Sequence, residues 1–86
     1  MAKKHLLLGE RRSFALRQLE AINLVEIGSL LEKREEDHVP DKVRARREDR
    51  LKFLLEQNRE IEQILERRAS EARRLVRGLA LEAATS

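Results

Sequence analysis

The chain has 86 residues, of which 41% are charged, 2% are aromatic and none is cysteine, and its net charge is +3 at pH 7. A chain of this length folds as one small domain that buries roughly 60% of its unfolded surface, so its core is marginal unless a partner completes it. Without cysteine, neither a disulfide nor a thiolate metal site can add stability, and the excess of Leu, Ala, Glu and Arg favours long helices over a sheet.

We expect neither a membrane span nor a signal peptide in the first residues of this sequence. The longest run of leucine covers only residues 6–8, far short of the roughly 20 apolar residues that a spanning helix needs. Gly9 and three charged residues follow this run at once, which a signal peptide does not allow. We therefore expect a cytoplasmic protein with no membrane partner.

The first helix is predicted over residues 9–37. One stripe along it repeats at spacings of three and four residues, as a helix face requires, and comprises Leu16, Leu19, Asn23, Ile27 and Leu30. Two alternatives remain open at Gly28 and Ser29. Ser29 and Glu32 fit a capping box, at which the helix would restart; otherwise the helix continues through the glycine at a cost of about 1 kcal/mol.

This first helix is apolar on more sides than one neighbouring helix can cover. Leu24 and Leu31 lie on a second side, and Phe14 and Val25 lie on a third. A helix that is apolar on several sides is buried on several sides, and exposing such side chains costs on the order of 1.5–3 kcal/mol each. We therefore predict a protein contact through these four residues, with Leu7 in support.

Pro40 marks the one clear break in the helical pattern. Proline disfavours helical angles in the residue before it and fits the first turn of a new helix. We predict a turn over residues 38–41, after which Asp41 or Asp37 caps the new helix. Between residues 32 and 50 the apolar stripe is absent, so the tip of the hairpin should project into water or into a partner.

The second helix is predicted over residues 41–81. Its stripe covers about four heptads, enough for a coiled-coil seam, and comprises Leu51, Leu54, Asn58, Ile61, Leu65, Ala72, Leu75 and Leu79. Apolar residues on either side of residue 41 lie at similar distances from it, so the chain should fold back there. The reflected pairs are Leu31 and Leu51, Ile27 and Leu55, Ile22 and Ile61, Leu16 and Leu65, and Leu8 and Leu75.

The predicted fold is all-α: one domain, residues 1–86, that forms a two-helix antiparallel, coiled-coil-like hairpin. A dimer or a partner protein should complete it as a four-helix bundle. Asn23 and Asn58 both lie on the apolar stripes and should come near the same level. A buried polar residue at such a position sets the register and the oligomeric state; in the alternative, both asparagines face solvent.

Arginines are concentrated toward the end of the second helix. Its dipole favours cations there, and glutamates four residues away can pair with them. The same side chains are a possible contact for an anionic partner such as RNA, although a net charge of +3 among so many opposite charges is a weak signal for nucleic acid. The residues concerned are Arg67, Arg73, Arg74 and Arg77.

The sequence has no pattern typical of catalysis or of metal binding. His5 and His38 lie alone, and there is no glycine-rich phosphate loop or nucleophile set. We predict a non-enzymatic protein without a cofactor or a small-molecule substrate. It would be a small adaptor, co-chaperone or assembly component that associates through helices with a second copy or another protein. The alternative is a small nucleic-acid-binding regulator that uses the arginines of the second helix.

Overall fold

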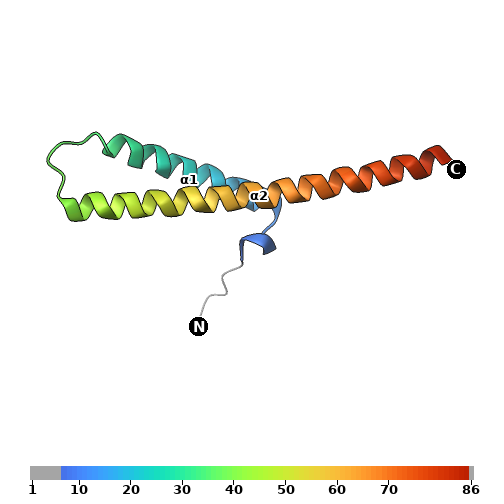
Figure 1. Ribbon diagram of the computed structural model, residues 1–86, viewed down its shortest axis with the longest axis horizontal. Coiled ribbons are helices and arrows are strands. Elements are labelled where there is room, and N and C mark those ends of the chain that lie inside the picture. Colours follow the sequence, from blue (N-terminus) through green and yellow to red (C-terminus); the bar gives the residue numbers. More distant parts are fainter. Residues whose placement is uncertain (1–6, 86) are drawn as a thin grey trace.

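The computed structural model describes residues 7–85. A short 3-10 turn, η1 (Leu8–Glu10), precedes two α-helices, α1 (Ser13–Lys33) and α2 (Asp41–Thr85), and these described residues contain no strand. α1 packs along the first part of α2 in the opposite direction, and the rest of α2 continues past the start of α1 (Figure 1). The prediction of an all-α antiparallel hairpin is therefore confirmed, while its completion as a four-helix bundle stays a prediction.

α1 is shorter than the predicted residues 9–37. It ends at Lys33 because the next residues have no apolar stripe to pack against α2. Three consecutive acidic residues at 35–37 would also lie at the helix C-terminus, where the helix dipole disfavours negative charge. At the other end, the backbone is extended at Arg12, with φ −66° and ψ 150°, so residues 11 and 12 link η1 to α1.

α1 runs through Gly28 without a break. Of the two alternatives, a restart at Ser29 or a continuous helix, the structure has the continuous helix. Glycine within a helix is less favourable than alanine by about 1 kcal/mol, because its unfolded backbone loses more conformational freedom. A Cβ built at Gly28 would meet no heavy atom within 4 Å. A side chain could therefore be added at this position without a clash within the hairpin.

We expect Gly28→Ala to raise the free energy of unfolding by about 0.5–1 kcal/mol. The measurement is a urea titration followed by circular dichroism, in which the midpoint should rise at an unchanged slope. Gly78→Ala is the matched control, because Gly78 also has open space around it but lies in a part of α2 that α1 does not cover. Gly78→Ala should therefore raise the urea midpoint by less than Gly28→Ala does. A loss of stability in Gly28→Ala would contradict a continuous helix at this position.

The chain reverses over residues 34–40, a longer segment than the predicted turn at 38–41. His38 adopts a positive φ of 61°, a conformation that side chains other than glycine rarely adopt. Pro40 comes directly before α2, and its carbonyl oxygen accepts hydrogen bonds from backbone amides in the first turn of that helix. Asp41 is thus the first helical residue rather than the cap, and its charge is favoured there by the helix dipole.

The core is one layer of side chains between α1 and α2, and the two predicted stripes supply nearly all of it. Ile64 takes the buried place that the stripe assigned to Leu65, which is half-buried. Ile64 lies in one buried cluster with Leu16 and Ile61, against which Leu8 of η1 also packs, so more than α1 covers this end of the seam. The buried apolar residues are Leu16, Ile27 and Leu30 from α1, and Leu51, Leu54, Ile61 and Ile64 from α2.

Four of the five reflected pairs are wrong, whereas Leu65 packs against the cluster that contains Leu16, as the remaining pair predicted. Leu30, rather than Leu31, lies in one buried cluster with Leu51. A step of one residue turns a helix by about 100°, so a small error in the fold point moves a side chain from the core to the surface. The paired residues that are exposed instead are Ile22, Leu31, Leu55 and Leu75.

Candidate interaction surfaces

The side of α1 that faces away from α2 is largely uncharged between positions 14 and 28, with Arg17 at its edge. Because α2 covers the opposite side of α1, these side chains have no cover within the hairpin, and Phe14, Ile22 and Val25 are 72%, 65% and 76% exposed. The set, which we call the outer face, consists of Phe14, Gln18, Ala21, Ile22, Val25 and Gly28.

The five predicted contact residues are all exposed, but they do not form one surface. Phe14 and Val25 lie on the outer face, whereas Leu24 and Leu31 lie on a flank of the hairpin, between the outer face and α2. Leu7 precedes η1 and lies outside α1. The sequence therefore identified exposed apolar residues correctly and overestimated how closely they gather.

α2 continues for about four turns beyond the reach of α1 (Figure 1, orange to red) and ends at Thr85, later than predicted. Its residues 71–85, which we call the overhang, are all exposed. One side of the overhang is apolar and continues the spacing of the seam. This overhang stripe comprises Ala72, Leu75, Val76, Leu79 and Ala80, and its three large side chains are 65–66% exposed.

Arg68 marks the point where the contact between the two helices ends. Its half-buried side chain donates hydrogen bonds to the carbonyl oxygens of Gly9 at 3.0 Å and Arg11 at 2.7 Å. It also donates to Oγ of Ser13 at 3.0 Å. These bonds tie the segment before α1 to α2. An arginine at the seam position three residues after Leu65 was a readable signal for a contact at this end of the hairpin.

Asn23 and Asn58 form a polar layer between the two ends of the core and are 5% and 8% exposed. Nδ2 of Asn23 donates to Oδ1 of Asn58 at 2.8 Å and to Oε1 of Gln57 at 2.7 Å. Nδ2 of Asn58 donates in turn to the carbonyl oxygen of Glu20 at 3.2 Å. The solvent-facing alternative is therefore wrong. The role of the pair in setting the register stays a prediction.

Two bidentate ion pairs join the arms of the hairpin. Nε and Nη2 of Arg34 donate to Glu48, both at 2.7 Å, and Arg50 donates to Glu26 at 2.5 and 3.1 Å. In each pair the hydrogen bonds lower the pKa of the glutamate. Their contribution to stability is therefore complete above the usual carboxyl pKa of about 4.5 and is lost as the pH falls through the lower folded-state pKa. Both pairs are solvent-exposed, so the contribution is small.

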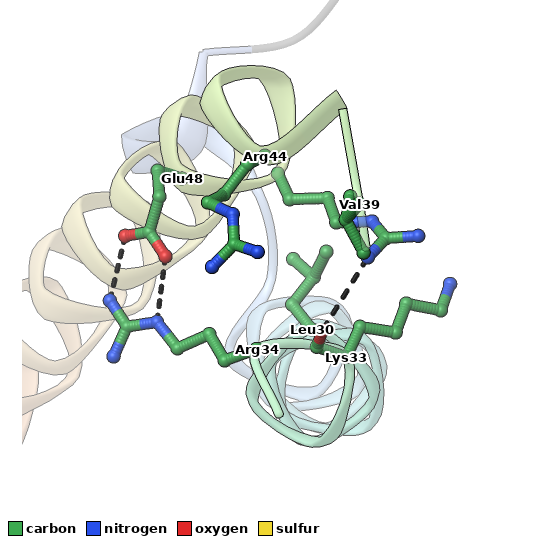
Figure 2. Close-up of a pocket in the computed structure, with 7 residues that line it drawn as sticks. Leu30, Lys33, Arg34, Val39, Arg44 and Glu48 are labelled. Carbon is green, nitrogen blue, oxygen red and sulfur yellow. Dashed lines mark hydrogen bonds and ion pairs between the residues drawn. The ribbon is translucent and has the colours of Figure 1, made fainter. Parts of the chain in front are cut away.

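A hollow of about 330 Å³ lies at the tip of the hairpin, between the end of α1 and the start of α2. Figure 2 shows Arg44 pointing into it from α2, Leu30 facing it from α1, and the Arg34–Glu48 pair along one side. The hollow is open to solvent, and its one carboxylate is already paired. This arrangement provides no set of groups for proton transfer or for nucleophilic attack.

The four arginines predicted as an anionic-partner contact lie together on the polar side of α2, away from the overhang stripe. Arg73 donates to Oε1 of Glu66 at 2.9 Å and to Oγ of Ser70 at 3.1 Å, so part of its charge is already paired. Glu71 lies in the same shallow surface. The full set is Arg67, Arg73, Arg74 and Arg77, all exposed.

Comparison with protein-family models, with curated protein sequences and with solved structures finds no match for this chain. Among residues 7–85, no helix is both long and apolar enough to cross a membrane. Within the same part of the chain, no group of three or more histidine, cysteine, aspartate or glutamate side chains is placed to hold a metal ion. The described surface does carry two exposed apolar helix sides, the outer face and the overhang stripe.

Proposed function

We propose that this chain is a non-enzymatic interaction protein of the cytoplasm, which works as a small adaptor, co-chaperone or assembly component by helix–helix association. The observation that carries the proposal is the outer face of α1, where Phe14, Ile22 and Val25 are at least 65% exposed. A small fold with a single-layer core has little stability to spare for side chains left in water.

The shape of the outer face favours a helical partner. It is straight and 15 residues long, or about 22 Å, and it is about as wide as one helix. Ala21 and Gly28 lie on it among the larger side chains, so a second helix can approach closely along this line. A compact ligand would cover only part of such a strip.

The energetics require several large side chains in one contact. Covering the exposed two thirds of a Val, Leu, Ile or Phe side chain contributes roughly 1–2 kcal/mol, whereas association costs an estimated 4–15 kcal/mol. The three large side chains of the outer face alone fall near the lower limit of that cost. A stable complex therefore needs further apolar contacts, and the overhang stripe offers them.

Charge substitution on α1 tests the proposal. The double variant Leu24→Glu, Val25→Glu should lose the partners that the immobilised wild-type chain captures from its native cells, because a carboxylate in a helix–helix contact is desolvated without a pair. Capture is read by mass spectrometry, with this chain itself counted among the possible partners. Circular dichroism should show unchanged helix content, since both residues are exposed.

The matched control adds the same two charges elsewhere. Gln63→Glu, Ser70→Glu places both on exposed positions of α2, away from the outer face, and should capture the same partners as the wild-type chain. If the Leu24→Glu, Val25→Glu variant also captures them all, the outer face is not the contact and the proposed function is wrong.

Binding of nucleic acid is the second candidate, supported by the four exposed arginines on one side of α2. Four phosphate contacts would make the affinity for single-stranded RNA or double-stranded DNA fall by about 50–150-fold between 50 and 200 mM salt. An apolar protein contact changes little over that range. A fluorescence-anisotropy titration at several salt concentrations separates the two functions, and Arg74→Ala, Arg77→Ala should flatten the salt dependence only under the second.

A further inference from the structure

The outer face of α1 and the overhang of α2 match in length. The outer face covers residues 14–28 and the overhang covers residues 71–85, so each is 15 residues long, or about 22 Å. Both are exposed and apolar along one side. They cannot cover each other within one chain, because the overhang is the straight continuation of α2 and points away from α1 (Figure 1).

We propose that the overhang of one copy lies on the outer face of α1 in a second copy, and that the overhang of the second copy lies in return on α1 of the first. This inference rests on the proposed function and names its partner as the chain itself. The two contacts are identical and related by one two-fold axis, so the assembly closes as a dimer. Each α1 is then held between its own α2 and the overhang of the partner.

The arrangement of the hairpin leaves room for this exchange. Arg68 holds the segment before α1 through Gly9 and Arg11, which fixes where α1 begins and leaves the overhang bare. The chain before α1 also leaves the line of the helix sideways (Figure 1). In this arrangement the two-fold axis passes near the first residues of both α1 helices. The α1 of the partner then lies beside the overhang and is collinear with the first α1.

The overhang stripe continues the contact that already exists within the chain. Ala72, Leu75 and Leu79 extend the three-and-four spacing of the seam beyond Arg68. A second α1 can therefore pack on the same side of α2. It would do so through its outer face and parallel to α2, whereas the first α1 packs antiparallel through its buried stripe. When the two 15-residue segments lie side by side and run in the same direction, the large Phe14 comes near the small Ala72. The small Ala21 comes near Leu79, so the side chains of the two surfaces interdigitate.

The area is sufficient for a stable dimer. Six large apolar side chains per chain, all 65–76% exposed, would be covered in two symmetric contacts. Over both chains of the dimer, this removes about 700 Å² of apolar surface from water. Apolar atoms supply about 60% of an interface, which gives roughly 1,200 Å² in all, at the lower end of the range for specific, stable interfaces. The residues are Phe14, Ile22, Val25, Leu75, Val76 and Leu79.

Light scattering of the full chain gives the first test. The wild-type chain should have twice the chain mass of 10.1 kDa, and Leu75→Glu, Leu79→Glu should halve that mass at unchanged helix content. Leu81→Glu is the matched control, because Leu81 is equally exposed but lies on the opposite side of α2, and it should remain a dimer. A monomeric wild-type chain, or a dimeric Leu75→Glu, Leu79→Glu variant, would overturn the exchange.

Cysteine cross-linking tests the pairing itself, since the chain has no cysteine of its own. The variant Ala21→Cys, Leu79→Cys should form a covalent dimer under mild oxidation, because the two positions are adjacent only between copies. Within one chain they are separated by several helical turns, whereas a disulfide needs Cα atoms within about 7 Å. Each single variant should stay uncrosslinked, and a covalent dimer of Leu79→Cys alone would show that overhang packs on overhang, which contradicts the proposal.

The exchange between copies and the proposed function can be refuted separately. If the wild-type chain is monomeric but loses captured partners on Leu24→Glu, Val25→Glu substitution, the exchange is overturned and the proposed function stands. If the chain is monomeric and that substitution changes nothing, both are wrong.

Discussion

Ile61→Ala should lower the free energy of unfolding by about 2–5 kcal/mol, because it removes a buried side chain and leaves a cavity that two helices cannot close. Ile61 is 0% exposed and packs with Leu16 and Ile64 in the cluster nearer the start of α1. A chain of this size is stabilised by only about 4–13 kcal/mol, so the variant should be largely unfolded at moderate temperature. Urea titration followed by circular dichroism measures the loss.

Leu55→Ala is the matched control for that substitution. Leu55 is an aliphatic residue of the same helix but is 51% exposed, so its truncation should change stability by less than about 1 kcal/mol. Equal losses from the two variants would mean that α1 packs in the register that pairs Ile27 with Leu55. The comparison therefore tests the observed register as well as the size of the core.

Asn58→Ala should cost about 1–3 kcal/mol, because it removes both hydrogen bonds that Asn58 makes and takes one of its two acceptors from the buried side-chain amide of Asn23. Replacing both asparagines, as Asn23→Leu with Asn58→Leu, should recover that loss or exceed it, since an apolar pair needs no partners. A double-mutant cycle measured in urea gives the coupling between the two side chains.

The same double variant tests whether the asparagine layer sets the register. Without a polar pair that must be satisfied, α1 and α2 have alternative registers of similar free energy. We expect light scattering and size-exclusion chromatography to show more than one species, despite equal or higher stability. A single species with the mass of the wild-type chain would contradict the role in setting the register, and equal stability losses in the single and double variants would contradict the coupling.

The sequence alone determined the features that depend on local spacing. The stripes around Leu16–Leu30 and Leu51–Ile61 follow from a repeat of three and four residues, which only a helix brings to one side. Pro40 determined where the chain could reverse, because its ring disfavours a helical residue before it. Asn23 and Asn58 are separated from Pro40 by nearly equal numbers of residues. This was enough to predict that they lie at the same level of the hairpin, where Asn23 donates a hydrogen bond to Asn58.

Tertiary structure decided the features that depend on how the two helices meet. The length of the reversal over residues 34–40 set the register, and one residue of difference turns a helix by about 100° and moved Leu31 out of the core. The packing of Leu8 from η1 against the cluster of Leu16, Ile61 and Ile64 extended the core at this end of the seam. The hydrogen bonds of Arg68 to the segment before α1 fixed where the first arm begins, and so how much of α2 is left uncovered. Each of these depends on contacts between residues far apart in the chain, which periodicity along one helix does not specify.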